Sequence, residues 1–335
     1  MNSDFLTPVQ MNRLNLNLQP IFIGQLFIVE ALHHPAYYYQ GNEYIQVLGS
    51  DEGINPNFIS DFAQNYSTEI FVHDEDFDYI NSKLKDELTK LTRSLSIGNI
   101  KKNAIKQTNY LSMQMENLYK DPFNDETLTS QFQNSKNLSA LLIGNKDIHK
   151  AVFENIKKSK YHYTHTQPLL SSVLLLSFAQ SLNLFNNNEL EELFLTSYFK
   201  DIGMSFIPRE KFEQSHLNEF DKILFAKHVE NSMLLLEGRV PFKSNHLNLI
   251  KNHHFLNYKI QALVSDQSAP VPTKFLIGVE SILLSSIDVL VAMISDRPYR
   301  EPVTSFEALA LLKDVISDEY PQEFRSMVIY IKNFL

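Results

Sequence analysis

Histidines and aspartates spread over residues 161–300 are the side chains of this sequence best suited to chemistry. They are His165, Asp201, His228, His253, His254 and Asp288. Asp201 closes a mainly apolar run that begins at Leu193, and Asp288 interrupts an apolar run over residues 282–293. An unpaired carboxylate moved out of water costs several kcal/mol or becomes neutral. We therefore expect both aspartates to face a cation, and a shared metal centre would supply one.

The amino-acid composition limits which metal ligands are available. The chain has no cysteine, so any metal must be held by imidazole and carboxylate groups. Nitrogen and oxygen ligands suit iron, manganese or zinc.

Five short segments around these residues follow one another in a characteristic order. They are His165-Thr166, Phe199-Lys200-Asp201-Ile202-Gly203-Met204, Leu217 to His228, His253-His254, and Asp288 with Ser295-Asp296-Arg297-Pro298-Tyr299-Arg300. In this order they resemble the HD-GYP family, metal-dependent phosphodiesterases that linearise cyclic di-GMP. The resemblance covers residues 161–324, about half of the chain.

The resemblance implies a site as well as an activity. By analogy, His165, Asp201 and Asp288 would hold one ion, and His228, His253 and His254 the other. Asp201 would bridge the two ions. The family resemblance favours iron as the metal. Arg297 and Arg300 would contact the substrate phosphate, because guanidinium groups pair bidentately with phosphate oxygens. The implied partner is cyclic di-GMP, in a signalling context with further protein partners.

The sequence also departs from the family pattern. Lys200 replaces the histidine of the His-Asp doublet, Met204 replaces a lysine, and the Gly-Tyr-Pro loop after the double histidine is absent. Lys200 either contacts a substrate phosphate or is an exposed or salt-bridged lysine, and the sequence leaves both open. The function expected is a cyclic di-GMP phosphodiesterase. The alternative is an inactive domain that binds cyclic di-GMP or a partner protein.

The whole chain has the length and composition of a two-domain globular protein. Its 335 residues carry a net charge of −9, which argues against coating a nucleic-acid polymer. Neither a signal peptide nor a long apolar run is evident, so we expect no membrane span and a cytoplasmic location.

The first half of the chain predicts a small α/β or α+β domain over residues 1–145, with an unknown ligand. Residues 20–30, 37–48 and 69–73 have the composition of strands. An apolar stripe follows over residues 80–95 at helical spacing. It is expected to pack on its own sheet, with a coiled-coil contact in a homodimer as the alternative. The polar segment up to residue 145 is taken as the end of this domain.

The second half, residues 146–335, predicts an all-α bundle of the HD type. Helices are expected at about residues 168–182, 190–198, 217–237, 246–255, 275–295 and 305–316. Facing helices of a bundle place side chains together in its core, so ligands far apart in the sequence can converge there. The fold class predicted for the whole chain is therefore α+β.

Overall fold

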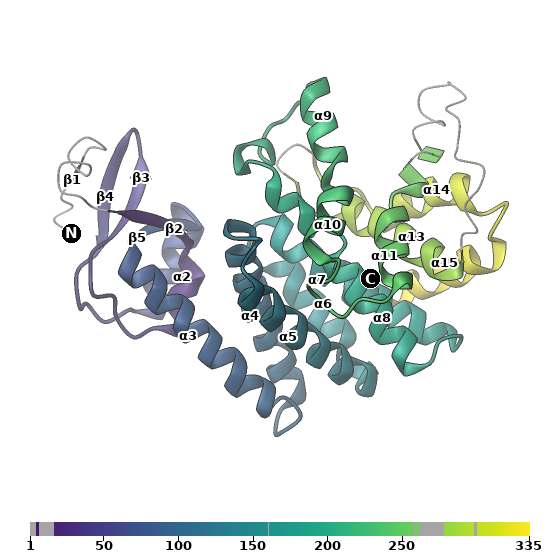
Figure 1. Ribbon diagram of the computed structural model, residues 1–335, viewed down its shortest axis with the longest axis horizontal. Helices are drawn as coiled ribbons and strands as arrows, with labels where there is room; N and C mark the ends of the chain where they lie inside the picture. The colour runs from purple at the N-terminus through teal and green to yellow at the C-terminus, as the bar shows by residue number, and fades with distance from the viewer. Residues whose placement is uncertain (1–4, 7–16, 160, 258, 261–277, 298–299) are drawn as a thin grey trace. The chain divides into compact units, whose positions relative to one another are not determined.

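The computed structural model describes residues 5–6, 17–159, 161–257, 259–260, 278–297 and 300–335 (Figure 1). The chain divides into two compact units, Met1–Ser94 and Leu95–Leu335. The first contains a sheet and the second contains helices, which confirms the predicted α+β class. The division lies well before residue 145, where the sequence analysis placed it.

The first unit is an antiparallel sheet covered by helices. Its strand order is β1-β4-β3-β5-β2, with the bounds Phe5–Leu6 (β1), Leu18–Phe22 (β2), Ala36–Gln40 (β3), Glu43–Leu48 (β4) and Glu69–His73 (β5). Helices α2 (Pro56–Asn65) and α3 (Asp74–Arg93) and the 3-10 helix η1 (Ile23–Ile28) complete it. Ile21, Ile70 and Val72 from the sheet and Ile80 from α3 share one buried cluster. This cluster is the core of the unit.

Two predicted strands of this unit differ from the observed ones. The strand expected over residues 20–30 ends at Phe22, where η1 begins. The strand expected over residues 37–48 is the β3–β4 hairpin, turned at Gly41 and Asn42 with φ of 61° and 67°. Two consecutive positive φ angles are typical of a tight hairpin turn, and glycine and asparagine tolerate them best. These two residues therefore reverse the chain where apolar content alone suggested one continuous strand.

The second unit is a helical bundle built around α7. Its α-helices are α4 (Ile100–Lys120), α5 (Asp125–Gly144), α6 (His149–Lys158), α7 (Tyr163–Leu182), α8 (Asn187–Phe199), α9 (Glu219–Ala226), α10 (His228–Leu236), α11 (Ser244–Asn252), α13 (Val279–Ile294), α14 (Ser305–Ile316) and α15 (Pro321–Phe334). Helix α7 packs against α4, α6, α8, α13 and α15. Its residues Leu169 to Gln180 are all buried, as a central helix requires.

Helices α4 and α5 occupy the segment that the sequence analysis assigned to the end of the first domain. Asn99 and Asn124 cap their first turns by accepting the N–H groups of Lys102 and Thr127. The pair belongs to the second unit, because α4 packs on α6 and α7, and α5 packs on α8. This packing places the boundary at Ser94 and Leu95.

The buried faces of α4 and α5 are rich in amides, which explains why an apolar pattern did not reveal them. The Gln107 side chain donates to the Asn134 carbonyl at 3.0 Å, and the Gln131 side chain donates to the Leu111 carbonyl at 3.0 Å. Buried polar groups are tolerated when they are hydrogen-bonded. Polar side chains thus occupy buried positions in a segment whose polar composition suggested the end of a domain.

The other helices agree with the predicted positions, with three differences. The helix expected over residues 217–237 is divided at Lys227 into α9 and α10, and neither α6 nor α15 was predicted. Most of the segment that replaces the Gly-Tyr-Pro loop lies outside the described residues.

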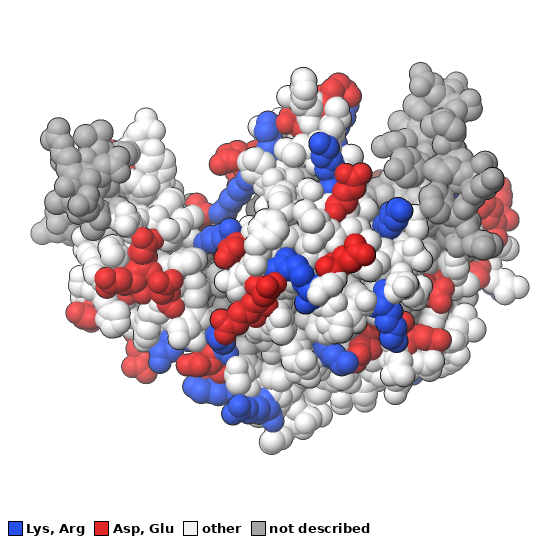
Figure 2. All heavy atoms as spheres, viewed as in Figure 1, with Lys and Arg blue, Asp and Glu red and all other residues white. Residues whose placement is uncertain are grey.

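No helix in the described parts of the chain is long and apolar enough to cross a membrane. On the face shown in Figure 2, lysines and arginines are interspersed with acidic residues over the helical unit.

Candidate metal centre

Helix ends and one buried helix position the predicted ligands. Asp201 lies two residues after the end of α8, His228 is the first residue of α10, and His253 and His254 follow the last residue of α11. Asp288 lies in the middle of α13, a helix buried over most of its length. Several elements distant in the sequence therefore contribute to one place in the bundle core, as expected for this architecture.

Gly203 allows the segment after Asp201 to approach α10 closely. A Cβ atom on Gly203 would lie 2.1 Å from the His228 carbonyl oxygen and 2.4 Å from the Ser232 nitrogen. The Gly203 N–H instead donates to Ser232 Oγ at 2.8 Å, and that hydroxyl donates to the Lys200 carbonyl at 2.8 Å. The glycine of the Asp-Ile-Gly segment thus sets the position of Asp201 relative to His228.

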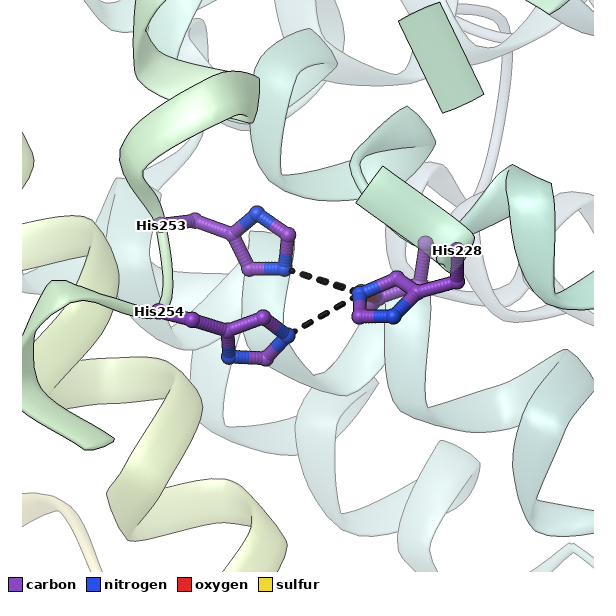
Figure 3. A group of neighbouring side chains, drawn as sticks. His228, His253 and His254 are labelled. Atoms are coloured by element: carbon purple, nitrogen blue, oxygen red, sulfur yellow. Dashed lines mark hydrogen bonds and ion pairs between the residues drawn. The ribbon is translucent and has the colours of Figure 1, made fainter. Parts of the chain in front are cut away.

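Asp201 and three histidines form one compact group of ligand atoms. Oδ1 of Asp201 lies 3.2 Å from Nε2 of His253 and 3.4 Å from Nε2 of His228. Nε2 of His228 lies 3.4 Å from that of His253 and 2.9 Å from that of His254. Figure 3 shows the three rings turned toward one another. One ligand atom from each of the four residues lies within 4.8 Å of all the others.

Backbone carbonyls fix the tautomers of two of these rings. Nδ1 of His228 lies 2.6 Å from the Phe225 carbonyl, and Nδ1 of His253 lies 2.6 Å from the Ile250 carbonyl. A carbonyl oxygen only accepts, so each Nδ1 carries a proton and each neutral ring has a bare Nε2. Both bare nitrogens face the carboxylate oxygen of Asp201. Acceptors that face one another at these distances require a cation or a proton between them.

The third ring, His254, depends on the Asn257 amide, which lies 2.7 Å from its Nδ1. With the amide nitrogen donating, the ring proton of His254 is on Nε2 and points to His228. With the amide turned over, its oxygen accepts from Nδ1–H and Nε2 becomes a ligand. Burial, His253 and His228 hold the pKa of His254 well below its ordinary value, so the ring is neutral at neutral pH. His254 can therefore complete the ligand set.

Lys200 is a buried cation between two aspartates. Its side chain is 1% exposed, and Nζ pairs with Oδ2 of Asp201 and, at 2.7 Å, with Oδ1 of Asp288. Burial lowers the pKa of Lys200, but the two carboxylates outweigh burial and raise it above the ordinary value. Burial raises the pKa of Asp201, but the Lys200 ammonium beside it brings that pKa well below its usual range. Lys200 and Asp201 are therefore charged.

Two predicted ligands stand apart from the compact group. Asp288 faces Lys200, whereas the His165 ring packs edge-on against Tyr119, with centroids 5.2 Å apart. Among the described residues, neither His165 nor Asp288 belongs to the group of ligand atoms within 4.8 Å. The structure thus brings together four of the six predicted ligands and separates the other two.

A cavity of about 270 Å³ opens beside this group, entirely within the helical unit. Asp201, Asp288, His254 and Arg297 are among its lining residues. The Arg297 guanidinium stacks 4.4 Å above the Tyr163 ring and donates to the Gln167 amide oxygen. Arg300 is exposed and donates to the Ala292 carbonyl at 2.7 Å. Of the two predicted arginines, Arg297 is among the described residues that line the cavity and Arg300 is not. Lys200 is not among the described lining residues either.

Several residues of the site were not anticipated from the sequence. Tyr163 and Gln167 hold Arg297 from one face of α7, and their spacing of four residues was a usable signal. Tyr119 lines the cavity from α4 and donates its hydroxyl to the Asp201 carbonyl at 3.3 Å. No signal pointed to Tyr119, because its segment had been assigned to the other domain.

A solved structure has a similar fold. It is that of Bd1817, a HDG"Y"P protein from Bdellovibrio bacteriovorus, with a TM-score of 0.66 and 16% sequence identity over 94% of this chain and 100% of that one. The chain has the HD-GYP fold. No family model matches the sequence, and no curated protein matches it. The HD-GYP likeness extends beyond the helical unit, because the matched share exceeds the length of that unit.

The four converging ligands fit one divalent ion. Metal–nitrogen and metal–oxygen bonds of about 2.0–2.2 Å place neighbouring ligand atoms about 3.0–3.5 Å apart. The distances from His228 Nε2 to His253 Nε2, to His254 Nε2 and to Asp201 Oδ1, and from His253 Nε2 to Asp201 Oδ1, are 2.9 to 3.4 Å. All four ligand atoms lie within 4.8 Å of one another. A second ion between Asp201 and Asp288 does not fit in the same way, because the Lys200 ammonium already lies between these carboxylates.

Proposed function

We propose that the helical unit is a metal-dependent phosphodiesterase of the HD-GYP type that hydrolyses cyclic di-GMP. The observation that carries the proposal is the contact between His253 and Asp201. The bare Nε2 of His253 faces Oδ1 of the Asp201 carboxylate at 3.2 Å. A metal ion bound to both atoms would make this arrangement of two acceptors favourable. The HD-GYP fold and the adjoining cavity support the same assignment.

The residues of the chain would divide the work of hydrolysis between them. His228, His253, His254 and Asp201 would hold one divalent ion, which supplies Lewis acidity toward the attacking water and the phosphoryl oxygens. In the reaction an oxygen–phosphorus bond forms to water, the bond to the ribose oxygen breaks, and that oxygen takes a proton. Arg297 would pair with the phosphate from the cavity wall, preoriented by Tyr163 and Gln167.

The cavity also sets how much of the substrate is enclosed. Sites that enclose drug-sized ligands measure about 300–1,000 Å³. At about 270 Å³, this one holds the scissile phosphodiester and its immediate neighbours. The rest of a cyclic dinucleotide would lie outside it.

The experiment compares the protein with its His253→Ala variant and with His216→Ala, a control at an exposed histidine. Each is loaded with iron, manganese or zinc, and the linear dinucleotide formed from cyclic di-GMP is measured by chromatography. We expect product with the wild type and His216→Ala and a loss of at least 100-fold with His253→Ala. Equal rates in all three, or metal-loaded protein that neither binds nor cleaves cyclic di-GMP, would contradict the proposal.

A second candidate function is binding of cyclic di-GMP without turnover. The observation that favours it is the ion pairing of Lys200 with Asp201 and Asp288, which uses carboxylate oxygens that a two-metal hydrolase needs. Calorimetric titration decides between the two. Saturable binding with no linear product, at full metal load, would favour the binding module.

A further inference from the structure

We infer that the centre takes a single metal ion, and that the Lys200 ammonium permanently fills the place of a second. This inference rests on the proposed function, because it concerns the same site. It departs from the two-ion centre that the sequence resemblance implied. Lys200 then acts as a positioning residue that holds two carboxylates in place of a metal.

The two oxygens of Asp201 carry the inference. Oδ1 faces the bare nitrogens of His228 and His253, whereas Oδ2 pairs with Lys200. A carboxylate that bridges two ions offers one oxygen to each. Here one oxygen faces the metal ligands and the other is bound to an ammonium.

Asp288 completes the site of the ammonium. Its Oδ1 lies 2.7 Å from Lys200 Nζ, and the side chain is only 10% exposed. Asp288 comes from α13 and Lys200 from the end of α8, so the ion pair joins two helices. A cation that pairs with both carboxylates fills the space where a second ion would find its oxygen ligands.

The remaining ligand expected for a second ion lies elsewhere. The His165 ring packs against Tyr119 and approaches His162, with ring centroids 5.2 Å and 5.9 Å away. Tyr119 in turn reaches the Asp201 carbonyl with its hydroxyl. The imidazole is thus held by neighbours outside the compact ligand group.

The backbone of Lys200 is held in place, which opposes release of the ammonium to make room for an ion. Ser232 Oγ donates to the Lys200 carbonyl and accepts the Gly203 N–H, each at 2.8 Å. The side chain is 1% exposed, so departure would leave a charge without its partners inside the protein. A second divalent ion would also be repelled by an ammonium this close.

The exchange of an ion for an ammonium has a chemical consequence. An ammonium carries one positive charge and has no vacant coordination position, so it neutralises carboxylates but gives no Lewis acidity. A two-metal site stabilises both the attacking and the leaving oxygen. A site with one metal and one ammonium supplies that stabilisation from one side only.

The test is a metal count on wild type, Lys200→Met and Lys227→Met. Lys227 is exposed and adjacent to His228, so Lys227→Met removes a nearby lysine without touching the ion pair. Each protein is titrated with Mn²⁺ alone and measured by elemental analysis and electron paramagnetic resonance. We expect one ion per chain, with the spectrum of an isolated Mn²⁺, in wild type and Lys227→Met. Lys200→Met should take up a second ion and show a spin-coupled pair.

Two ions in the wild type, or one ion in a folded Lys200→Met, would overturn the inference and leave the proposed function standing. No bound ion in the wild type would overturn both. Lys200→His removes the same ammonium and adds an imidazole, so it replaces Lys200→Met if that variant does not fold. If neither variant folds, the wild-type count decides, because one isolated ion supports the inference and two ions contradict it.

Discussion

Lys200 Nζ lies 2.7 Å from Oδ1 of Asp288, and the same ammonium pairs with Oδ2 of Asp201. The sequence left open whether this lysine contacts substrate or forms a salt bridge. The described structure places it in a salt bridge within the bundle core. The ammonium meets the need of two buried carboxylates for a cation, a need that a metal alone was expected to meet.

Replacing only one partner of the ion pair between Lys200 and Asp288 should destabilise the protein strongly, because the other charge is left buried without its partner. Breaking a buried pair costs about 3–5 kcal/mol, whereas replacing both partners with apolar residues costs much less. We expect Lys200→Met and Asp288→Leu each to lower the urea midpoint of unfolding in metal-free protein. The double variant should lose less than the sum of the two. Additive losses would show that the two side chains are not coupled.

Gly203→Ala should disrupt the metal ligands without removing any of them. The new Cβ would meet the His228 carbonyl and the Ser232 nitrogen, so Asp201 and His228 must move apart. We expect metal affinity to fall about 10-fold to 100-fold, the range for changes that disturb ligand orientation. Competition with a fluorescent chelator measures it. Gly144→Ala is the control, since nothing lies within 4 Å of a Cβ there, and it should bind metal as the wild type does.

Arg297→Ala should weaken binding of cyclic di-GMP, whether or not the protein turns it over. Loss of a hydrogen bond to a charged group costs about 1.5–3 kcal/mol, which corresponds to roughly 10-fold to 150-fold in affinity. Arg300→Ala removes an exposed arginine that is not among the described lining residues, so it should bind almost as the wild type does. Calorimetric titration at matched metal load compares them. A larger loss from Arg300→Ala would place the phosphate elsewhere.

His149 should make the helical unit sensitive to acid, independently of the metal centre. Its Nε2–H donates to the Leu142 carbonyl at 2.7 Å, and burial, the first cause, lowers its pKa below the ordinary 6.5. The unfolded chain therefore binds a proton near pH 6.5 while the folded protein remains neutral. This contribution to stability is complete above pH 6.5 and is lost as the pH falls toward the folded-state pKa.

The matched variant is His149→Gln, which has no titrating group at this position. It should lose less stability than the wild type between pH 7.5 and pH 5, measured by urea midpoints at both pH values. Parallel losses in the two proteins would assign the acid sensitivity to other groups.

Hydrophobic spacing alone determined most of the helical unit, but it failed at α4 and α5. The helices from α7 to α14 were predictable because their buried residues are apolar and recur at helical spacing. Helices α4 and α5 bury the glutamine side chains Gln107 and Gln131, whose partners come from the other helix of the pair. The side chains of such a face are polar and find their hydrogen-bond partners only in the folded pair, so an apolar pattern in the sequence cannot reveal it. The domain boundary was misplaced for the same reason.

The residue types along the sequence determined that a cation would be needed near Asp201 and Asp288, since a carboxylate in an apolar helix must be compensated. Only the tertiary structure decided which cation it is. A difference of a few ångströms decides whether a side chain can be a metal ligand or only lies near one. Helix packing sets these distances. The same packing brought His228, His253 and His254 to Asp201, placed Lys200 between the aspartates, and left His165 against Tyr119.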